Sequence, residues 1–389
     1  MTARLPPLFA MLQQLVAAPS VSCSTPALDM SNRGVIDLLA TWLLALDFEV
    51  QIIPITGQAT PAGQLPKANL IATRGSGPGG LVLAGHTDTV PYDTHSWQQD
   101  PFALTERDQR WYGLGATDMK GFFPVALEAI KSFADVEFKQ PLIVLATADE
   151  ETSMDGARQL VEQGHPKARF AVIGEPTDLK PARLHKGMMM ESLTLTGRSG
   201  HSSDPALGAN ALEAMTDAIG ELRNFRAELQ QRYRNAAFHV QVPTLNLGCI
   251  HGGDSPNRIC GECELHFDLR PLPGMDIHEL RKTIAQRLQP IAEKNGVNIQ
   301  LRSLFPGIQP FEQKADSELV RAIEHLSGHA AGTVAFATEA PFMQALGMDT
   351  VVFGPGSISQ AHQPNEYIEM AQIEPAIAAL KGLIQKFCL

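Results

Sequence analysis

The sequence predicts an α/β protein whose main domain, a mostly parallel sheet flanked by helices, is interrupted by a smaller α+β domain. Short continuous apolar runs indicate strands that are buried on both faces, as strands of parallel sheets are. These runs are Leu81 to Ala84, Leu142 to Ala146, Phe170 to Ile173 and Val351 to Phe353. Helical patterns such as Val125 to Phe133 and Ala157 to Gln163 lie between them, which favours helices covering the sheet.

The pattern changes near residue 183. Alternating strands and amphipathic helices follow in the order β-α-β-β-α-β, predicted at 191–196, 209–233, 244–250, 259–270, 277–294 and 297–304. The parallel-strand signature returns only at Val351. We therefore expect a discontinuous main domain of residues 1–182 and 306–389, with an inserted domain of residues 183–305.

Two further segments are assigned from local composition. Leu8 to Val16 places its apolar residues at helical spacing, which predicts an amphipathic surface helix rather than an export signal. Pro61 to Gly80 is rich in Gly and Pro and is predicted to form loops.

Composition excludes several classes of protein. The 389 residues carry 31 basic and 42 acidic side chains, a net charge of −11, without a cluster of Lys or Arg. Because binding to nucleic acid depends on neutralising phosphates, a nucleic-acid partner is not expected. No apolar run approaches the roughly 18–20 residues that span a bilayer, so the sequence predicts a soluble protein without a membrane partner.

Five cysteines are an odd number in a long chain, which is not typical of a secreted disulfide framework and favours the reducing cytoplasm. Cys260 and Cys263 form a lone CxxC pair inside the predicted strand 259–270. Residues three apart in a strand point to opposite faces, so we expect structural cysteines rather than a metal or redox pair.

Imidazoles and carboxylates follow the predicted parallel strands, at the edge where ligands bind in such sheets. His86 and Asp88 follow the first run, Glu150 and Glu151 the second, Glu175 the third, and a loop after the fourth leads to His362. Asp118 lies where another loop enters a helix. Each of these residues alone is better explained as a solvated loop residue or a helix cap than as a ligand. Together, and without thiols, they suit one or two zinc, cobalt or manganese ions.

Spacing suggests roles within this group. His86 and Asp88 are two residues apart, so in extended chain the carboxylate can orient the second nitrogen of the imidazole. Glu150 and Glu151 are adjacent and would point in opposite directions in extended chain. One of them can then bind metal while the other stays free as a general base.

These segments resemble the co-catalytic metallohydrolase family that includes aminoacylases, succinyl-diaminopimelate desuccinylases and acetylornithine deacetylases. The resemblance covers essentially the whole chain. It is carried by Gly85-His86-Thr87-Asp88-Thr89-Val90-Pro91, Thr117-Asp118-Met119-Lys120-Gly121, Ala148-Asp149-Glu150-Glu151-Thr152-Ser153, Gly174-Glu175-Pro176-Thr177, Gly200-His201-Ser202-Ser203 and Gln360-Ala361-His362-Gln363-Pro364. A non-catalytic relative would lack a ligand or the base, and none is missing.

The resemblance implies a catalytic main domain that holds two zinc ions per subunit, for which cobalt or manganese can substitute. Asp118 would bridge the two metals, with the remaining ligands supplied by His86 and Glu175 at one site and by Glu151 and His362 at the other. Glu150 would be the general base, and Asp88 would also serve catalysis. His201 would stabilise the oxyanion from the partner subunit, which implies a homodimer formed through the inserted domain.

Within the family, the chain is most similar to the acetylornithine deacetylase branch, through segments such as His185-Lys186-Gly187 and Thr338-Glu339-Ala340-Pro341-Phe342. The expected reaction is hydrolysis of N2-acetyl-L-ornithine to L-ornithine and acetate, for arginine biosynthesis. Another N-acyl amino acid and N-succinyl-diaminopimelate remain alternative substrates.

Three residues are candidates for substrate binding. Asn257 and Arg270 match family positions that hold the substrate carboxylate, although Arg270 shares the polar face of its strand with Asp268 and an ion pair between them is an equal alternative. We also hypothesise that Glu339 recognises the cationic side chain of ornithine, because an amine requires an anionic partner.

Overall fold

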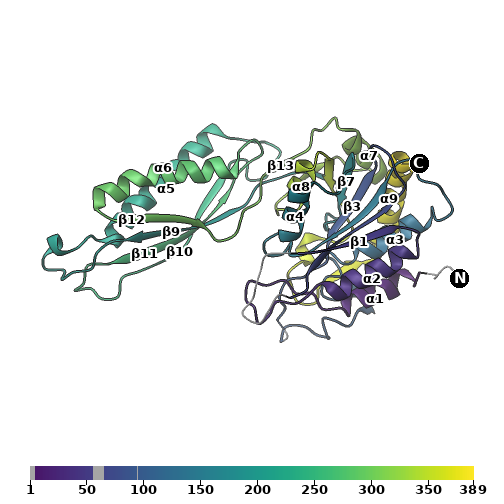
Figure 1. Ribbon diagram of the computed structural model, residues 1–389, viewed down its shortest axis with the longest axis horizontal. Helices are drawn as coiled ribbons and strands as arrows, with labels where there is room; N and C mark the ends of the chain where they lie inside the picture. The colour runs from purple at the N-terminus through teal and green to yellow at the C-terminus, as the bar shows by residue number, and fades with distance from the viewer. Residues whose placement is uncertain (1–4, 56–64, 94) are drawn as a thin grey trace. The chain divides into compact units, whose positions relative to one another are not determined.

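The computed structural model describes residues 5–55, 65–93 and 95–389, and the chain divides into two compact units (Figure 1). Unit 1 consists of Met1–Arg183, Gln313–Val334 and Thr338–Leu389, and unit 2 of Leu184–Glu312 with Ala335–Ala337. Unit 2 thus continues past residue 305, where the sequence analysis places its end. The reason is local pairing, because Ile308 forms a β-bridge with Met188.

The larger sheet is mixed and has the order β1-β2-β6-β3-β7-β15-β8-β13, with β14 paired to β8. Most of its strands belong to unit 1, whereas β13 and the second half of β8 belong to unit 2. Its strands are β1 (Glu49–Pro54), β2 (Ala68–Arg74), β3 (Leu81–His86), β6 (Leu142–Thr147), β7 (Phe170–Ile173), β8 (Ala182–His185), β13 (Phe311–Glu312), β14 (Gly332–Val334) and β15 (Asp349–Val352). The neighbours β6, β3, β7 and β15 run parallel, and β1, β2, β8 and β13 are added antiparallel. The α/β class is confirmed, with parallel pairing confined to the centre of the sheet.

The predicted loop segment Pro61 to Gly80 contains a strand, so that prediction is wrong for residues 68–74. These residues form β2, which pairs with β1 on one side and β6 on the other. Residues 61–64 of the segment lie outside the described residues. The Gly and Pro residues that suggested loops flank the strand, and the strand itself is buried from Ala68 to Ala72.

Helices cover both faces of this sheet. They are α1 (Leu8–Val16), α2 (Arg33–Leu44), α3 (Phe122–Lys131), α4 (Asp155–Gln163), α7 (Glu318–Ser327), α8 (Ala340–Ala345) and α9 (Ile373–Cys388). A single apolar cluster joins α1, α2, α3, α7 and α9 to the sheet, whereas α4 and α8 pack against each other (Figure 1). Among the described residues, no helix is both long and apolar enough to cross a membrane.

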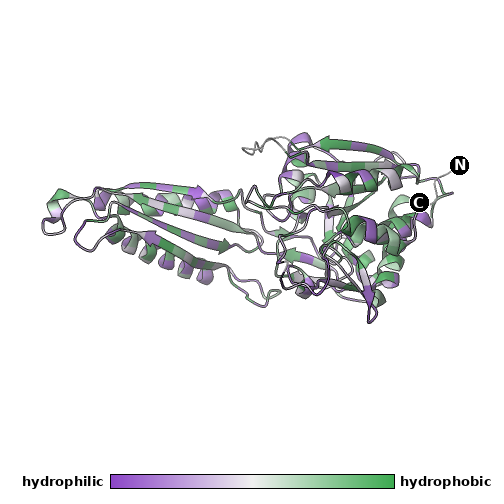
Figure 2. Cartoon of the chain, turned by 90° about the horizontal axis from the view of Figure 1, so that it is seen from below, coloured by the Kyte–Doolittle hydropathy of each residue, from purple (hydrophilic) through white to green (hydrophobic). Residues whose placement is uncertain are grey.

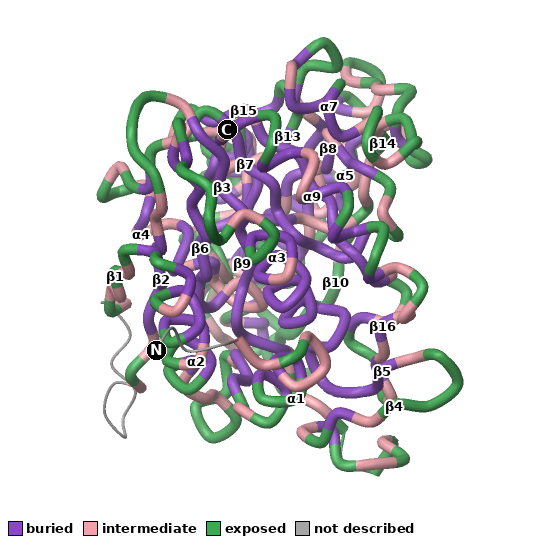
Figure 3. Tube along the Cα trace, turned by 90° about the vertical axis from the view of Figure 1, so that its right-hand side faces the viewer, coloured by how far each residue is buried: buried purple, intermediate pink, exposed green. Residues whose placement is uncertain are grey.

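The central strands are buried along their whole length (Figure 3). Leu81 and Leu83 belong to the cluster with α1, α2, α3, α7 and α9. Val82 and Ala84 are equally buried but lie outside that cluster, because successive side chains in a strand point to opposite faces. Burial on both faces explains why these strands read as continuous apolar runs in the sequence.

A small sheet in the order β16-β5-β4 borders unit 1, formed by β4 (Thr105–Arg107), β5 (Arg110–Tyr112) and β16 (Tyr367–Glu369). Short 3₁₀ turns, η2 (Ile358–Gln360) and η3 (Met370–Gln372), flank β16 in the sequence. In the small sheet, β16, which follows η2 in the sequence, pairs with β5, which precedes α3.

Unit 2 has the element order β-α-β-β-α-β. Its elements are β9 (Met189–Thr196), η1 (Pro205–Leu207), α5 (Ala211–Arg232), β10 (Thr244–Gly252), β11 (Glu262–Arg270), α6 (Ile277–Asn295) and β12 (Asn298–Ser303). The strands form an antiparallel sheet in the order β10-β11-β9-β12. Hydrophobic and hydrophilic residues alternate along them (Figure 2), because one face packs on α5 and α6 and the other does not.

The two helices of unit 2 are capped and tied to the sheet. Asn210 and Asp276 cap the N-termini of α5 and α6 by accepting bonds from backbone N–H groups. The fully buried carboxylate of Glu191 on β9 accepts a bidentate bond from the Arg281 guanidinium on α6, with one pair of atoms 2.7 Å apart. This bond satisfies a charge that would be costly to bury unpaired.

Cys260 and Cys263 do not lie on opposite faces of one strand, contrary to the prediction. Strand β11 begins at Glu262, so Cys260 lies before it, and both cysteines are buried in the apolar cluster of unit 2. All five cysteines are free thiols.

His185 on β8 gives unit 2 a specific sensitivity to acid. It is fully buried beside the Phe311 ring, and burial lowers the pKa of His185 from 6.5 to about 4. Between these values the unfolded chain binds a proton that the folded chain does not, so stability falls as the pH falls from about 6.5 to about 4. At about 1.4 kcal/mol per pH unit, the loss approaches about 3 kcal/mol.

We predict that His185→Gln removes this loss, so that the free energy of unfolding measured by urea titration falls less steeply with acid than in the native chain. The exposed His278, changed in the same way, is the matched control and should follow the native curve. Identical acid dependence of the His185 variant and the native chain would contradict the assignment.

Candidate metal centre

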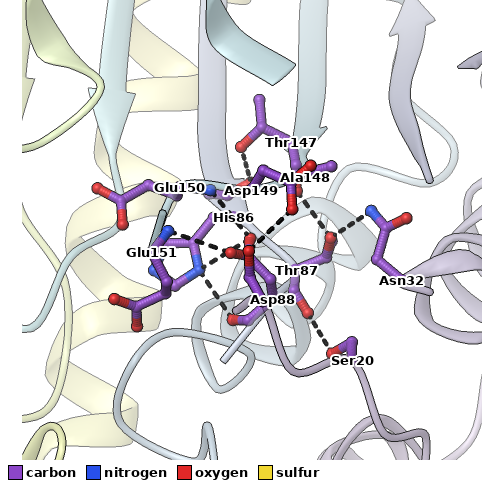
Figure 4. A network of polar contacts seen from close by, with 12 residues as sticks. Ser20, Asn32, His86, Thr87, Asp88, Thr147, Ala148, Asp149, Glu150 and Glu151 are labelled. Carbon is purple, nitrogen blue, oxygen red and sulfur yellow. Dashed lines mark hydrogen bonds and ion pairs between the residues drawn. The ribbon is translucent and has the colours of Figure 1, made fainter. Parts of the chain in front are cut away.

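The carboxyl ends of the parallel strands bring the predicted residues of unit 1 to one edge of the sheet. His86 is the last residue of β3, and Glu175 follows β7 after one glycine. Hydrogen bonds hold the ends of β3 and β6 together, since the Thr87 hydroxyl donates to the Thr147 carbonyl at 2.7 Å and receives a bond from Asn32 at 2.8 Å (Figure 4). The backbone at the ends of β3 and β6 is therefore held in place by bonds that involve none of the candidate ligands.

Asp118 lies between the two histidines and presents a different oxygen to each. Its Oδ1 is 3.0 Å from Nε2 of His86, and its Oδ2 is 3.4 Å from Nε2 of His362. A carboxylate that serves two imidazoles with its two oxygens has the arrangement of a bridge between two metal ions. The side chain is almost fully buried, at 7% exposure, so these directions are held by the surrounding protein.

Carboxylates complete both sides of this arrangement. Glu175 Oε1 is 3.9 Å from Nε2 of His86, and both oxygens of Glu151 lie 3.1 Å from Nε2 of His362. Ligand atoms lie within 4.8 Å of one another in the triads His86-Asp118-Glu175, Asp118-Glu151-His362 and His86-Glu150-Glu151. The structure thus brings together all five sequence-predicted metal ligands, together with Glu150.

The turn after β6 differs from the extended chain assumed for Glu150 and Glu151. Asp149 has a positive φ of 61°, and the chain turns there. Both glutamates consequently lie on the side of His86 rather than pointing in opposite directions (Figure 4). The turn is held from the other side by Lys67, whose ammonium is 2.5 Å from the Asp149 carboxylate and 2.7 Å from Asp29.

Asp88 positions this turn more directly than it orients the imidazole. Nδ1 of His86 is 3.0 Å from the backbone carbonyl of Asp88 but 3.6 Å from its carboxylate. The carboxylate instead accepts the backbone N–H groups of Glu150 at 3.3 Å and Glu151 at 3.1 Å (Figure 4). The predicted carboxylate-to-imidazole bond is therefore replaced by a carbonyl-to-imidazole bond, which fixes the ring equally well.

Two glycines allow the close packing that the site needs. A Cβ on Gly121 would lie 2.1 Å from the Ala116 carbonyl, inside the loop that carries Asp118. A Cβ on Gly174, which precedes Glu175, would lie 2.2 Å from the Phe122 ring. Any larger residue at either position would displace a ligand loop.

The electrostatics of the group are those of a site that requires cations. Burial raises the pKa of Glu150 and of Glu175 well above 4.5, with neighbouring carboxylates adding to the effect. Hydrogen bonds to Asp118 and Glu151 raise the pKa of His362 to about 10. Burial alone would lower the pKa of His86, but its bond to Asp118 and the nearby carboxylates raise it well above 6.5. Divalent cations compete with protons for such carboxylates and imidazoles, so metal binding at this group is expected to release protons.

Glu339 lies at the same edge, immediately before α8. Its Oε2 accepts a bond from the Thr147 hydroxyl at 2.9 Å, and it is 1% exposed. Its Oε1 is buried without a hydrogen-bond partner among the described residues. Burial raises the pKa of Glu339 to about 7. An unsatisfied buried oxygen of this kind is uncommon in folded proteins.

The remaining predicted residues lie in unit 2. His201 is exposed, and its Nδ1 accepts bonds from the backbone N–H of Ser203 at 3.2 Å. Asn257 is exposed and accepts a bond from the Ser255 hydroxyl at 2.6 Å. Arg270 donates to Asp268 at 2.9 Å, which is the ion pair considered as the alternative from the sequence.

Sequence reasoning missed several residues that shape the site. Thr147, Lys67 and Glu366 all contact the loops that carry ligands. Glu366 could have been suspected from its position four residues after His362, but no local pattern distinguishes a buried Glu from a solvated one. Lys67 carries no signal in the sequence, because its partners lie 38 and 82 residues away.

Comparison with known proteins identifies the family. The model of peptidase family M20/M25/M40 matches residues 82–386, which include every unit 1 residue assigned above to the centre. The chain belongs to this peptidase family. Membership makes it a hydrolase of a metal-dependent family, in agreement with the predicted metal chemistry.

Individual members of the family are similar over their full length. An acetylornithine deacetylase from Pasteurella multocida (strain Pm70) is 48% identical over 385 residues, covering 99% of each chain. An acetylornithine deacetylase from Klebsiella pneumoniae (strain 342) is 48% identical over 384 residues, covering 99% of this chain and 98% of the relative.

Solved structures of the family have the same fold. An M20 family metallo-carboxypeptidase from Sulfolobus solfataricus matches with a TM-score of 0.74 at 18% identity, covering 98% of this chain and 99% of that one. A dinuclear metal-binding peptidase of the family from Bacillus subtilis matches with a TM-score of 0.67 at 15% identity, covering 97% and 98%.

The donor set in this M20 chain fits divalent metals. Imidazole nitrogens and carboxylate oxygens without thiolates suit zinc, cobalt and manganese. The two oxygens of Asp118 face different histidines, and the group ranges from the buried His86, Asp118 and Glu175 to the exposed His362.

Proposed function

We propose that the centre holds two zinc ions per chain, one bound by His86 and Glu175, the other by Glu151 and His362, with Asp118 shared. Cobalt or manganese would substitute, because the donor set admits all three. The observation that carries this proposal is the direction of the two Asp118 oxygens, each toward a different histidine.

Glu150 is the proposed general base. Two divalent ions in this site supply Lewis-acid activation of water and of an acyl carbonyl. Glu150 is not needed as a ligand, and its carboxylate lies within 4.8 Å of the ligand atoms of His86 and Glu151. It would take the proton from the attacking water and pass it to the leaving amine, since an amide nitrogen leaves poorly unless protonated. Asp88 holds the backbone of Glu150 in place for both transfers.

His201 is proposed to stabilise the oxyanion from the partner subunit of a homodimer formed through unit 2. The bonds that its Nδ1 accepts leave the proton of a neutral imidazole on Nε2, which is then a donor. Unit 2 also exposes several large apolar side chains, which an interface with another chain would cover. They include Met190, Leu207, Leu212, Val240, Ile250 and Leu304.

The proposed reaction is hydrolysis of N2-acetyl-L-ornithine to L-ornithine and acetate, a step of arginine biosynthesis in the cytoplasm. Relatives named acetylornithine deacetylase, 48% identical over 99% of the chain, support this substrate. The five free thiols suit a reducing compartment.

Glu339, Arg270 and Asn257 are the proposed substrate contacts. The buried, unpartnered oxygen of Glu339 would accept a bond from the ammonium of the ornithine side chain. Arg270 would exchange its bond with Asp268 for the substrate carboxylate, because a planar guanidinium binds carboxylates in bidentate fashion. Asn257 would assist as a neutral donor from the same unit.

Initial hydrolysis rates test the substrate assignment. The metal-loaded chain should cleave acetylornithine faster than succinyl-diaminopimelate and a neutral N-acetyl amino acid, and chelation should abolish all activity. Glu339→Gln should reduce the preference for acetylornithine over the neutral substrate by about 10- to 100-fold, since it removes a charged hydrogen bond.

The exposed Glu162, changed to Gln, is the control and should keep the native preference. An unchanged preference in the Glu339 variant would sink the role of that residue. Faster cleavage of another substrate by the native chain would overturn the assignment of acetylornithine while leaving the metal chemistry intact.

Replacement of the base tests the mechanism. Glu150→Gln should lower kcat by about 10²- to 10⁴-fold, the contribution of general acid–base catalysis. Because Glu150 is not a ligand in this account, the variant should keep two bound metals per chain, as measured by atomic absorption. Native kcat in the fully metallated variant would show that another group carries the proton.

A further inference from the structure

Glu366 is a buried carboxylate, 2% exposed, that binds the loop carrying Asp118. Its Oε2 accepts the backbone N–H of Gly115 at 2.9 Å, and its Oε1 accepts those of Thr117 at 2.7 Å and Asp118 at 2.9 Å. Both oxygens are used, and one of the donors is the backbone N–H of Asp118. The carboxylate therefore fixes the backbone from which the shared ligand projects.

The contact extends beyond one side chain. The carbonyl of Glu366 accepts the N–H of Gly113 at 3.0 Å, and the carbonyl of Tyr367 accepts a bond from the Thr117 hydroxyl. Strand β16, which begins at Tyr367, pairs with β5 just before this loop. The loop from 113 to 118 is thus held against the segment 366–367 at several points.

The same segment carries the other histidine of the centre. His362 lies four residues before Glu366, and its Nε2 is 3.4 Å from Oδ2 of Asp118. One short stretch of chain therefore supplies a ligand and also holds the backbone of the shared ligand. A shift of Glu366 would change the distance between His362 and Asp118 directly.

The polar partners of Glu366 and of the nearby Lys120 lie inside the protein. Lys120 is fully buried, interacts electrostatically with Glu366, and donates to the carbonyls of Leu15 at 3.1 Å and Ala18 at 2.8 Å. The side chain of Glu366 is satisfied by its three backbone N–H donors and needs no metal of its own. Glu366 is consequently distinct from the carboxylates that face the metal sites.

We propose that Glu366 is a positioning residue of the metal centre, which sets Asp118 relative to His362 so that one carboxylate can serve both metals. This inference rests on the proposed two-metal function. Removal of a group that orients a metal ligand typically weakens metal binding by about 10- to 100-fold.

Glu366→Gln isolates the role of the carboxylate. The amide keeps the shape of the side chain but replaces one acceptor oxygen with a donor, so at least one backbone N–H of the loop must lose its partner. Glu366→Asp keeps the charge but shortens the reach by one methylene. Glu369→Gln is the matched control, because Glu369 lies three residues along the chain and its partner Arg110 is partly exposed.

The experiment measures binding of Zn²⁺ and Co²⁺ to the metal-free native chain and variants by calorimetry, together with the visible spectrum of bound Co²⁺. Glu366→Gln should bind at least one of the two metals about 10- to 100-fold more weakly, with an altered Co²⁺ spectrum. Glu369→Gln should match the native chain in both, and Glu366→Asp should fall between them. Circular dichroism checks that each metal-free variant is folded.

Native affinity and a native Co²⁺ spectrum in Glu366→Gln would overturn the proposal. If Glu366→Gln does not fold, the same measurements are made on Glu366→Asp. Native metal affinity and a native Co²⁺ spectrum in Glu366→Asp would then overturn the proposal. If the native chain does not bind two metals, the proposed function is refuted instead. This outcome is measured on the native chain alone, so it is distinct from a failure of the Glu366 proposal.

Discussion

Repulsion among buried carboxylates is the constraint on which the rest of the structure depends. Asp118, Glu150, Glu151 and Glu175 lie together at one edge of the sheet, with ligand atoms a few ångströms from two histidines. Like charges at such distances repel strongly in a medium of low dielectric, and burial adds a desolvation cost for each. Burial is the largest cause of the raised pKa values of Glu150 and Glu175, and the neighbouring carboxylates raise these values further. Positive charge placed among these carboxylates offsets both the repulsion and the desolvation cost.

The acidic residues at this edge of the sheet fall into two groups that differ in their partners. Asp88 and Glu366 accept backbone N–H groups, and each holds a loop that carries a ligand. Carboxylates used in this way are satisfied by the protein itself. Asp118, Glu151 and Glu175 face the histidines and are the proposed carboxylate ligands of the metal ions, which would supply the missing charge. The parallel strands make this division possible because they end at one edge, where several loops meet.

The sequence is informative wherever structure depends on local patterns. Strands β3, β6 and β7 are buried on both faces, so they appear as uninterrupted apolar runs, and the residues that follow them lie at the site. Asp118 is recognisable because it belongs to a compact segment that enters a helix. Family resemblance adds the roles of the individual residues, which spacing alone leaves open.

Other features depend on partners far away in the chain and have no local pattern. Strand β2 lies among Gly and Pro residues and is held by pairing with β1 and β6. The positive φ of Asp149 redirects Glu150 and Glu151, which a reading of extended chain cannot anticipate. Glu366 owes its burial to a loop almost 250 residues earlier. In each case the deciding contact is tertiary, so the chain has to be folded before the contact can be seen.

The central claim is that Asp118 joins two metal sites. Anomalous diffraction at the zinc edge, from crystals of the chain grown with zinc, tests it most directly. The account predicts two peaks per chain, one beside His86 and Glu175 and the other beside Glu151 and His362, both in contact with Asp118. A single peak, or two peaks that do not share Asp118, would contradict it.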